Sequence, residues 1–124
     1  MNSVIHFELP VKDMNRAQEF YARVFGWITT NFDPDNVLVS TAESGVDGQP
    51  TRPGAINGSF RRVNNSSPLV VIEVSDVAQQ LEIVKRNGGT VVDEPISIPN
   101  RGLIARFRDS EGNLVGLWQN KPTV

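Results

Sequence analysis

His6 is the single histidine of the chain, and its side chain is the best candidate for proton transfer or metal binding near neutral pH. Glu8 follows two residues later, and alternate residues of a strand share one face. An imidazole and a carboxylate on one face can form an acid–base pair, bind a metal or contact an organic ligand. The alternative is a neutral histidine that only lines a core or pocket. His6 and Glu8 are therefore candidates for catalysis and for ligand binding.

Glycines and tryptophans in or beside the predicted strands extend this candidate site. Glycine within a strand often marks the close approach of a ligand or of another backbone, which applies to Gly58 and Gly116. A bulge or a contact between strands would explain the same residues. Trp27 and Trp118 could each stack on a flat ligand, or pack in the core. The polar neighbours of the first glycine that could contact a ligand are Asn57 and Ser59.

The elements that must position these residues fall into two halves. The first half contains strands over 4–9, 27–32, 37–41 and 55–62, and a helix that Asp13 caps and Gly26 ends. Pro10 is expected to end the first strand. The polar segment 41–54 is long enough for a functional lid, or for a disordered tip. The helix stripe expected to cover Ile5, Phe7 and Leu9 consists of Ala17, Phe20, Tyr21 and Val24.

The second half repeats this pattern, with strands over 69–74, 90–93, 103–108 and 114–119. Its helix begins at Asp76 and ends at Gly88 and Gly89. An offset of 63 residues superposes Asp13 on Asp76, and later an offset of 58 superposes Gly58 on Gly116 and Phe60 on Trp118. The repeat predicts an α+β fold of two tandem βαβββ modules that form a curved mixed sheet around a concave cleft. A single domain is expected over residues 1–124, with modules at about 1–63 and 67–121.

Two motifs carry a family resemblance. The segments 5–13 (IHFELPVKD) and 109–119 (DSEGNLVGLWQ) resemble the opening and closing motifs of the vicinal-oxygen-chelate superfamily, which includes glyoxalases, bleomycin-resistance proteins and dioxygenases. The segment 56–62 is similar to the fourth strand of a branch of predicted enzymes related to lactoylglutathione lyase. The resemblance covers essentially the whole chain and implies the same paired-module fold.

The resemblance also locates the residues where relatives bind a metal. In metal-dependent members, the first, fourth, fifth and eighth strands each supply one ligand to a divalent ion. Here those positions hold His6, then Asn57 or Gly58, then Leu69 and Gly116. Because only His6 is a good ligand, we expect no four-ligand metal site and predict no cofactor. A divalent metal held by His6 with carboxylates stays open as the alternative.

Composition limits the functions further. A net charge of −2 gives no basic surface for nucleic acid or an anionic membrane, and Arg61-Arg62 is expected to be a solvated strand end rather than a phosphate site. There is no cysteine, which excludes disulfides and thiolate chemistry. We find no signal peptide or membrane-spanning segment, so a cytoplasmic location is expected. Open sheet edges favour a homodimer.

Two main functions remain after these exclusions. The first is a protein that binds a small organic molecule in the cleft without the usual metal, and the second is a metal-dependent or His6-dependent lyase or isomerase of the glyoxalase type. A regulatory subunit with a vestigial pocket is a third. The residues expected to contact the ligand are His6, Glu8, Trp27, Asn57, Gly58, Ser59, Leu69, Gly116 and Trp118.

Overall fold

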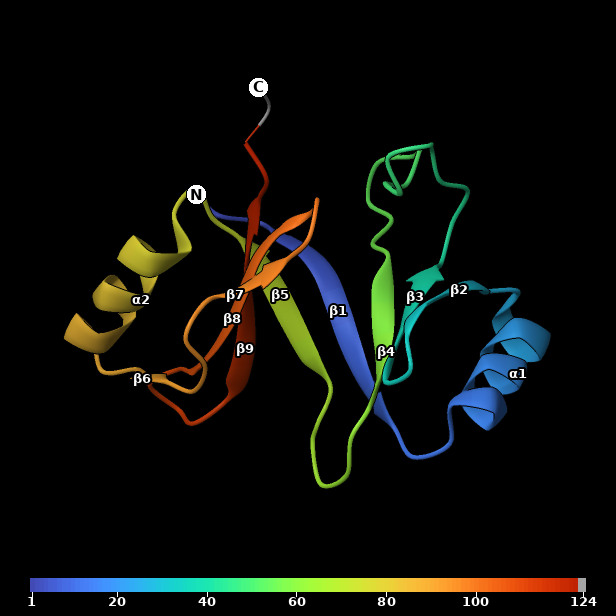
Figure 1. The fold of residues 1–124 in the computed structure, drawn as a ribbon, viewed down its shortest axis with the longest axis horizontal. Helices are drawn as coiled ribbons and strands as arrows, with labels where there is room; N and C mark the ends of the chain where they lie inside the picture. The colour runs from blue at the N-terminus through green and yellow to red at the C-terminus, as the bar shows by residue number, and fades with distance from the viewer. Residues whose placement is uncertain (123–124) are drawn as a thin grey trace. The chain divides into compact units, whose positions relative to one another are not determined.

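The computed structural model describes residues 1–122 and has the α+β composition expected from the sequence (Figure 1). It folds as two compact units. We call His6–Pro68 the N-terminal module, and Leu69 onward together with Met1–Ile5 the C-terminal module. The α+β class and the tandem βαβββ modules are confirmed. That the two modules form one domain stays a prediction.

The N-terminal module contains one helix, three complete strands, and the strand β1 from its third residue onward. Their bounds are β1 Val4–Val11, α1 Met14–Phe25, β2 Ile28–Asp33, β3 Asn36–Ser40 and β4 Gly58–Arg62. The strands lie in the order β2-β3-β4-β1, with β4 parallel to β1 and the other pairs antiparallel. The prediction that Pro10 ends β1 is wrong. Proline lacks only the backbone N–H donor, so the strand continues past Pro10 to Val11. The Val11 carbonyl accepts from Val63 N–H at 3.2 Å.

Both predicted ends of α1 are confirmed. The Asp13 side chain accepts from Arg16 N–H at 3.0 Å, and Gly26 adopts the left-handed conformation with φ 73°. The Gly26 N–H donates to the Ala22 carbonyl, which closes the last helical turn. Aspartate before the helix and glycine after it therefore fix where the chain leaves and re-enters the sheet.

The core of the N-terminal module lies between α1 and one face of its strands. Phe7 and Leu9 pack there with Ala17 and Tyr21 of the helix, as the alternation in β1 predicts. Phe20 and Val24, however, are each 54% exposed, so their assignment to the buried stripe is wrong. Their place is taken by Trp27, whose ring stacks on Tyr21 with centroids 4.7 Å apart. The buried members of this core are Val11, Val37, Val39 and Phe60.

The C-terminal module repeats the plan with an additional short strand. Its elements are β5 Leu69–Glu73, α2 Val77–Arg86, β6 Thr90–Val91, β7 Ile96–Ile98, β8 Gly102–Arg108 and β9 Leu114–Asn120. The order is β5-β9-β8-β6, with β7 beside β8 and β5 parallel to β9. The sequence did not predict β7. Asp76 caps α2 through Gln79 N–H at 3.0 Å, as predicted.

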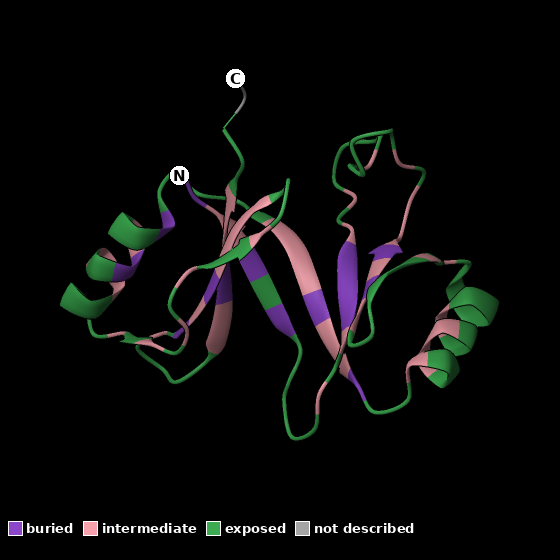
Figure 2. Ribbon diagram, viewed as in Figure 1, coloured by how far each residue is buried: buried purple, intermediate pink, exposed green. Residues whose placement is uncertain are grey.

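The C-terminal core is likewise confined to the helix-covered face. Its buried members are Val74, Val77, Leu81, Ala105, Phe107 and Leu117. Figure 2 shows buried residues on α2, whereas α1 contributes only half-buried side chains to its own module. Neither helix found among residues 1–122 has the length and apolar character needed to cross a membrane.

Candidate functional site

Four polar side chains share the helix-free face of the N-terminal module. In the parallel pair of β1 and β4, Glu8 lies opposite Ser59, and Pro10 lies opposite Arg61. Because Phe7 and Leu9 face the helix, the alternation of strand residues places His6 and Glu8 on the other side. Ser59 and Arg61 share that side, since Phe60 between them is in the core. We call His6, Glu8, Ser59 and Arg61 the polar cluster.

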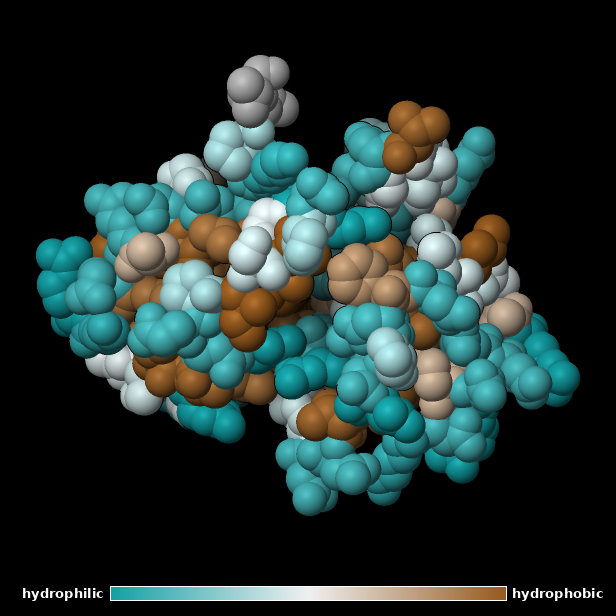
Figure 3. Space-filling view, in the orientation of Figure 1, coloured by the Kyte–Doolittle hydropathy of each residue, from teal (hydrophilic) through white to brown (hydrophobic). Residues whose placement is uncertain are grey.

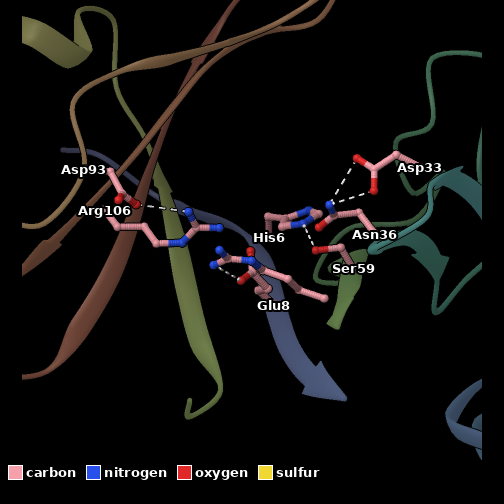
Figure 4. Close-up of polar contacts among 8 residues, drawn as sticks. His6, Glu8, Asp33, Asn36, Ser59, Asp93 and Arg106 are labelled. Atoms are coloured by element: carbon pink, nitrogen blue, oxygen red, sulfur yellow. Dashed lines mark hydrogen bonds and ion pairs between the residues drawn. The ribbon is translucent and has the colours of Figure 1, made fainter. Parts of the chain in front are cut away.

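The His6 ring and the Ser59 hydroxyl form the first pair of the polar cluster. His6 Nε2 and Ser59 Oγ are 3.2 Å apart and share a hydrogen bond, and the two side chains point toward each other (Figure 4). Burial lowers the pKa of His6 from its usual 6.5, while the nearby Glu8 carboxylate acts in the opposite direction. The imidazole is therefore mainly neutral at neutral pH and keeps one nitrogen that can accept a proton or a hydrogen bond.

Glu8 and Arg61 form the second pair. Arg61 Nη1 lies 3.6 Å from Glu8 Oε1, and the glutamate side chain is 10% exposed whereas the arginine side chain is 36% exposed. A buried carboxylate is stable only with a compensating charge or hydrogen bonds. Arg61 supplies such a charge, and its partial exposure keeps the guanidinium within reach of solvent or a ligand. From the sequence, Arg61 was not expected in the site, because Arg61-Arg62 is a doublet typical of a solvated strand end.

Asn57, for which ligand contact stays a prediction, uses its amide to hold the long loop between β3 and β4. Its Oδ1 accepts from Thr41 N–H at 3.0 Å, and its Nδ2 donates to Ser44 Oγ at 2.8 Å and to the Gly48 carbonyl at 3.0 Å. Segment 41–57 is thus tied across its base. Its tip carries the fully exposed Val46, and Figure 3 shows an apolar group at the top of this loop.

Gly58 and Trp27 lie away from the polar cluster. A side chain at Gly58 would meet the Phe7 ring at 2.5 Å, so this glycine makes room for an aromatic ring on the helix side. Trp27 packs on Tyr21 and Phe7 in the same core. Of the alternatives open from sequence, close packing explains Gly58 and core packing explains Trp27.

Leu69, Gly116 and Trp118 lie on the helix-free face of the C-terminal module. Val71 pairs with Gly116, and the neighbouring Leu117 is in the helix-side core. A Cβ on Gly116 would lie 3.0 Å from Val71 Cγ2 and 3.4 Å from Leu69 Cδ1. Trp118 Nε1 donates to Asn120 Oδ1 at 2.7 Å. Whether these residues act in one site with His6 stays a prediction.

The strand registers correct the predicted correspondence between the modules. Glu8 pairs with Ser59 in the first module, and Val71 pairs with Gly116 in the second. Because β1 and β5 correspond at the predicted offset, Ser59 and not Gly58 is the counterpart of Gly116. Arg61, in place of Phe60, is then the counterpart of Trp118. The error arose because the glycines were matched by type, although one faces the helix and the other does not.

The side chains at the four ligand positions do not fit a divalent metal. With the corrected register, these positions hold His6, Ser59, Leu69 and Gly116, which supply one imidazole and one hydroxyl. Tight transition-metal sites use three or four converging nitrogen, oxygen or sulfur ligands. Throughout the described chain, no group of three or more His, Cys, Asp or Glu side chains is arranged to hold a metal ion. Glu8, the nearest carboxylate to His6 along the strand, is instead engaged with Arg61.

The paired βαβββ modules define a class of fold, and sequence comparison identifies the family. Residues 3–117 match the Glyoxalase/Bleomycin resistance protein/Dioxygenase superfamily, and the chain belongs to that family. A glyoxylase-like domain-containing protein of Didymella fabae is 29% identical over 114 residues, covering 86% of this chain and 84% of that protein. The resemblance to the vicinal-oxygen-chelate superfamily is thereby confirmed.

Solved structures agree with the fold assignment. Methylmalonyl-CoA epimerase from Mycobacterium tuberculosis aligns with a TM-score of 0.66 at 18% identity, covering 96% of this chain and 88% of the epimerase. The Mn(II)-bound glyoxalase from Novosphingobium aromaticivorans aligns with a TM-score of 0.65 at 20% identity, covering 100% of this chain and 43% of that one. At these identities the likeness establishes the fold alone.

Proposed function

We propose that this protein binds a small organic molecule on the helix-free face of the N-terminal module, and does so without a resident metal ion. The observation that carries the proposal is the side-by-side arrangement of the His6–Ser59 hydrogen bond and the Glu8–Arg61 ion pair. A few convergent polar groups on a largely apolar scaffold are typical of small-molecule sites. The epimerase and glyoxalase among its structural neighbours support a small-molecule role in preference to a structural one.

A ligand screen with matched variants tests this proposal. Wild-type protein is screened by thermal shift against a library of small organic molecules, and compounds that stabilise it are measured by calorimetry. Ser59→Ala and His6→Ala should weaken binding about tenfold each, because each removes a hydrogen-bonding group worth on the order of 1 kcal/mol. Gln18→Ala is the control, since it removes a hydrogen bond to Thr29 made by a residue of α1. Equal binding by wild type and both cluster variants would contradict the proposal.

The second candidate is a His6-dependent lyase or isomerase. Its support is the mainly neutral imidazole beside a carboxylate, which is the state a general base needs. We propose that this activity is absent, because the four ligand positions do not fit the divalent metal that would stabilise an enediolate and the one arginine of the polar cluster, Arg61, is already paired with Glu8. The assay follows lactoylglutathione formation from methylglyoxal and glutathione. Turnover by wild type that disappears in His6→Gln would favour the enzyme over the binding protein.

A metal titration tests the metal-free part of the proposal. Protein purified without an affinity tag should bind Zn, Ni, Mn or Fe only weakly, since the four family positions supply only one good ligand. The measurement is elemental analysis followed by calorimetric titration. Submicromolar affinity that is lost in His6→Ala would show that carboxylates elsewhere complete a metal site.

We also propose that the chain forms a homodimer, as open sheet edges favour. Within their modules, β2 and β6 are at the ends of the strand orders, and unpaired edges tend to associate. Light scattering at tens of micromolar distinguishes the states. A mass near 13.7 kDa would exclude the dimer at that concentration.

A further inference from the structure

The two adjacent arginines of β4 have different environments, although the sequence presents them as a doublet. Arg62 is satisfied by Asp35, whose Oδ1 accepts from its Nε at 2.9 Å and from its Nη2 at 2.6 Å. Arg61 lies on the opposite face of the strand and approaches Glu8 only at 3.6 Å. The pleat of the strand therefore separates two like charges and gives each its own acidic partner.

Most of the hydrogen-bonding capacity of Arg61 is available to a ligand. A guanidinium carries five N–H donors in a planar fork, and within residues 1–122 the structure records this single ion pair for its side chain and no side-chain hydrogen bond. The 36% exposure of Arg61 contrasts with the 10% exposure of Glu8. The carboxylate is thus enclosed while the cation remains accessible beside the His6–Ser59 pair.

We infer that the ligand of the polar cluster is a small carboxylic acid that also carries a hydroxyl group. Its carboxylate binds the Arg61 fork, and its hydroxyl group hydrogen-bonds to His6 or Ser59. This inference rests on the proposed function and specifies its ligand class. An arginine fork matches a carboxylate through two parallel hydrogen bonds. A monoanion is favoured over a phosphate dianion because Glu8 already places one negative charge beside the same guanidinium, and repulsion grows with the ligand charge.

Matched acids and amides separate charge recognition from shape. Alternate residues such as His6 and Glu8 are about 7 Å apart along a strand, so the probes are the ortho, meta and para hydroxybenzoates. Each is compared with the corresponding hydroxybenzamide, which has nearly the same shape and no charge. Binding is measured by calorimetry in wild type, Arg61→Gln, Arg61→Lys and Arg62→Gln. The last variant removes the same charge from the neighbouring residue on the opposite face.

At least one acid should bind wild type, and its amide should bind much more weakly. Arg61→Gln should weaken the acid by about tenfold to a hundredfold, the range for a lost charge-assisted contact. Arg61→Lys should be intermediate because it keeps the charge and loses the fork. Arg62→Gln should change affinity by less than about twofold. Because Arg61→Gln removes a positive charge that faces the Glu8 carboxylate and could unfold the module, the Glu8→Gln/Arg61→Gln double variant is measured as well, and it too should not bind the acid.

Several outcomes would overturn the inference. Amides that bind as tightly as acids would remove the role of charge, and 4-hydroxyphenyl phosphate binding more tightly than the acid would contradict the ligand class. Acid binding that survives in both the single and the double variant would remove Arg61 from the site. If uncharged compounds bind wild type and Ser59→Ala abolishes that binding, the carboxylate inference fails and the proposed function stands. If no compound of the library or of the probe set binds wild type, the proposed function fails with it.

Discussion

The helix-free faces of the two modules share a backbone plan and differ in chemistry. Where the N-terminal module has the polar cluster, the corresponding residues of the C-terminal module are Leu69, Val71, Gly116 and Trp118. The C-terminal face still contains an arginine, because Arg106 lies opposite Gly116 on β8 and forms an ion pair with Asp93 at 3.1 Å. The arginine of the polar cluster is on β4, whereas Arg106 and Arg108 of the C-terminal face are on β8. Duplicated backbones can therefore keep their packing while the side chains for ligand recognition diverge.

The largest expected effect tests whether the two helix-side cores are equivalent. Phe60 and Leu117 occupy corresponding positions and are 0% and 2% exposed. Phe60→Ala should lower the free energy of unfolding by about 3–5 kcal/mol, and Leu117→Ala by about 2–5 kcal/mol, through lost burial and cavity formation. Urea denaturation measures both. A large loss in only one variant would show that the cores do not contribute equally to the cooperative fold.

Gly116→Leu tests how tightly the helix-free face of the C-terminal module is packed, for comparison with the N-terminal module. A Cβ at this position would be 3.0 Å from Val71 Cγ2, so a leucine must displace its neighbours. We expect a loss of about 1–3 kcal/mol in the free energy of unfolding. The matched variant Ser59→Ala removes atoms in place of adding them and should cost less. A melting temperature of Gly116→Leu within a degree of wild type would show that this face is loosely packed.

Asn57→Ala tests the contrast between the long loop of the first module and the tight turn of the second. Removing the amide breaks contacts with Thr41, Ser44 and Gly48, and we expect a loss of about 1–3 kcal/mol. Amide hydrogen exchange should accelerate at Gly45 and Thr51, whose N–H groups bond within the loop. Turn residues 109–113 serve as the internal reference. Unchanged exchange in the loop would mean that other contacts hold it.

The smallest expected effect is a pH dependence that only the N-terminal face should contribute. Burial lowers the His6 pKa in the folded state, so the unfolded chain binds the proton more readily. The folded state therefore loses stability as the pH falls below about 6.5, and the histidine contributes nothing above it. His6→Leu copies the corresponding residue, Leu69, and should flatten the difference between unfolding at pH 7 and pH 5.5. An equal pH dependence in both proteins would contradict the assigned pKa direction.

Helix ends and the faces of β1 could be predicted because they depend on local rules. Asp13 and Gly26 have properties that suit helix caps in almost any context, and strict alternation fixed the sides of His6 and Phe7. The register of β4 could not be predicted, since pairing with β1 is long-range and glycine has no side chain to reveal its face. The hydrogen bonds of Asn57 to the loop could not be predicted either, because its partners lie up to sixteen residues away in the sequence. Phe20 was wrongly assigned to the buried face of the helix. Trp27, which follows the helix and is not part of its periodic pattern, covers Tyr21 in place of Phe20.

The alternation along Gly58–Arg62 also bears on how the chain avoids misfolding. A slip of β4 by one residue against β1 would turn Phe60 out to the helix-free face and force Arg61 into the apolar core. Glu8 and Asp35 would each lose their arginine in the same step. The one-residue slip therefore loses the core aromatic and both ion pairs together, so intermediates with that register should be short-lived. A single-residue insertion within this strand would impose that slip on the residues after it, so β4 should tolerate changes in length poorly.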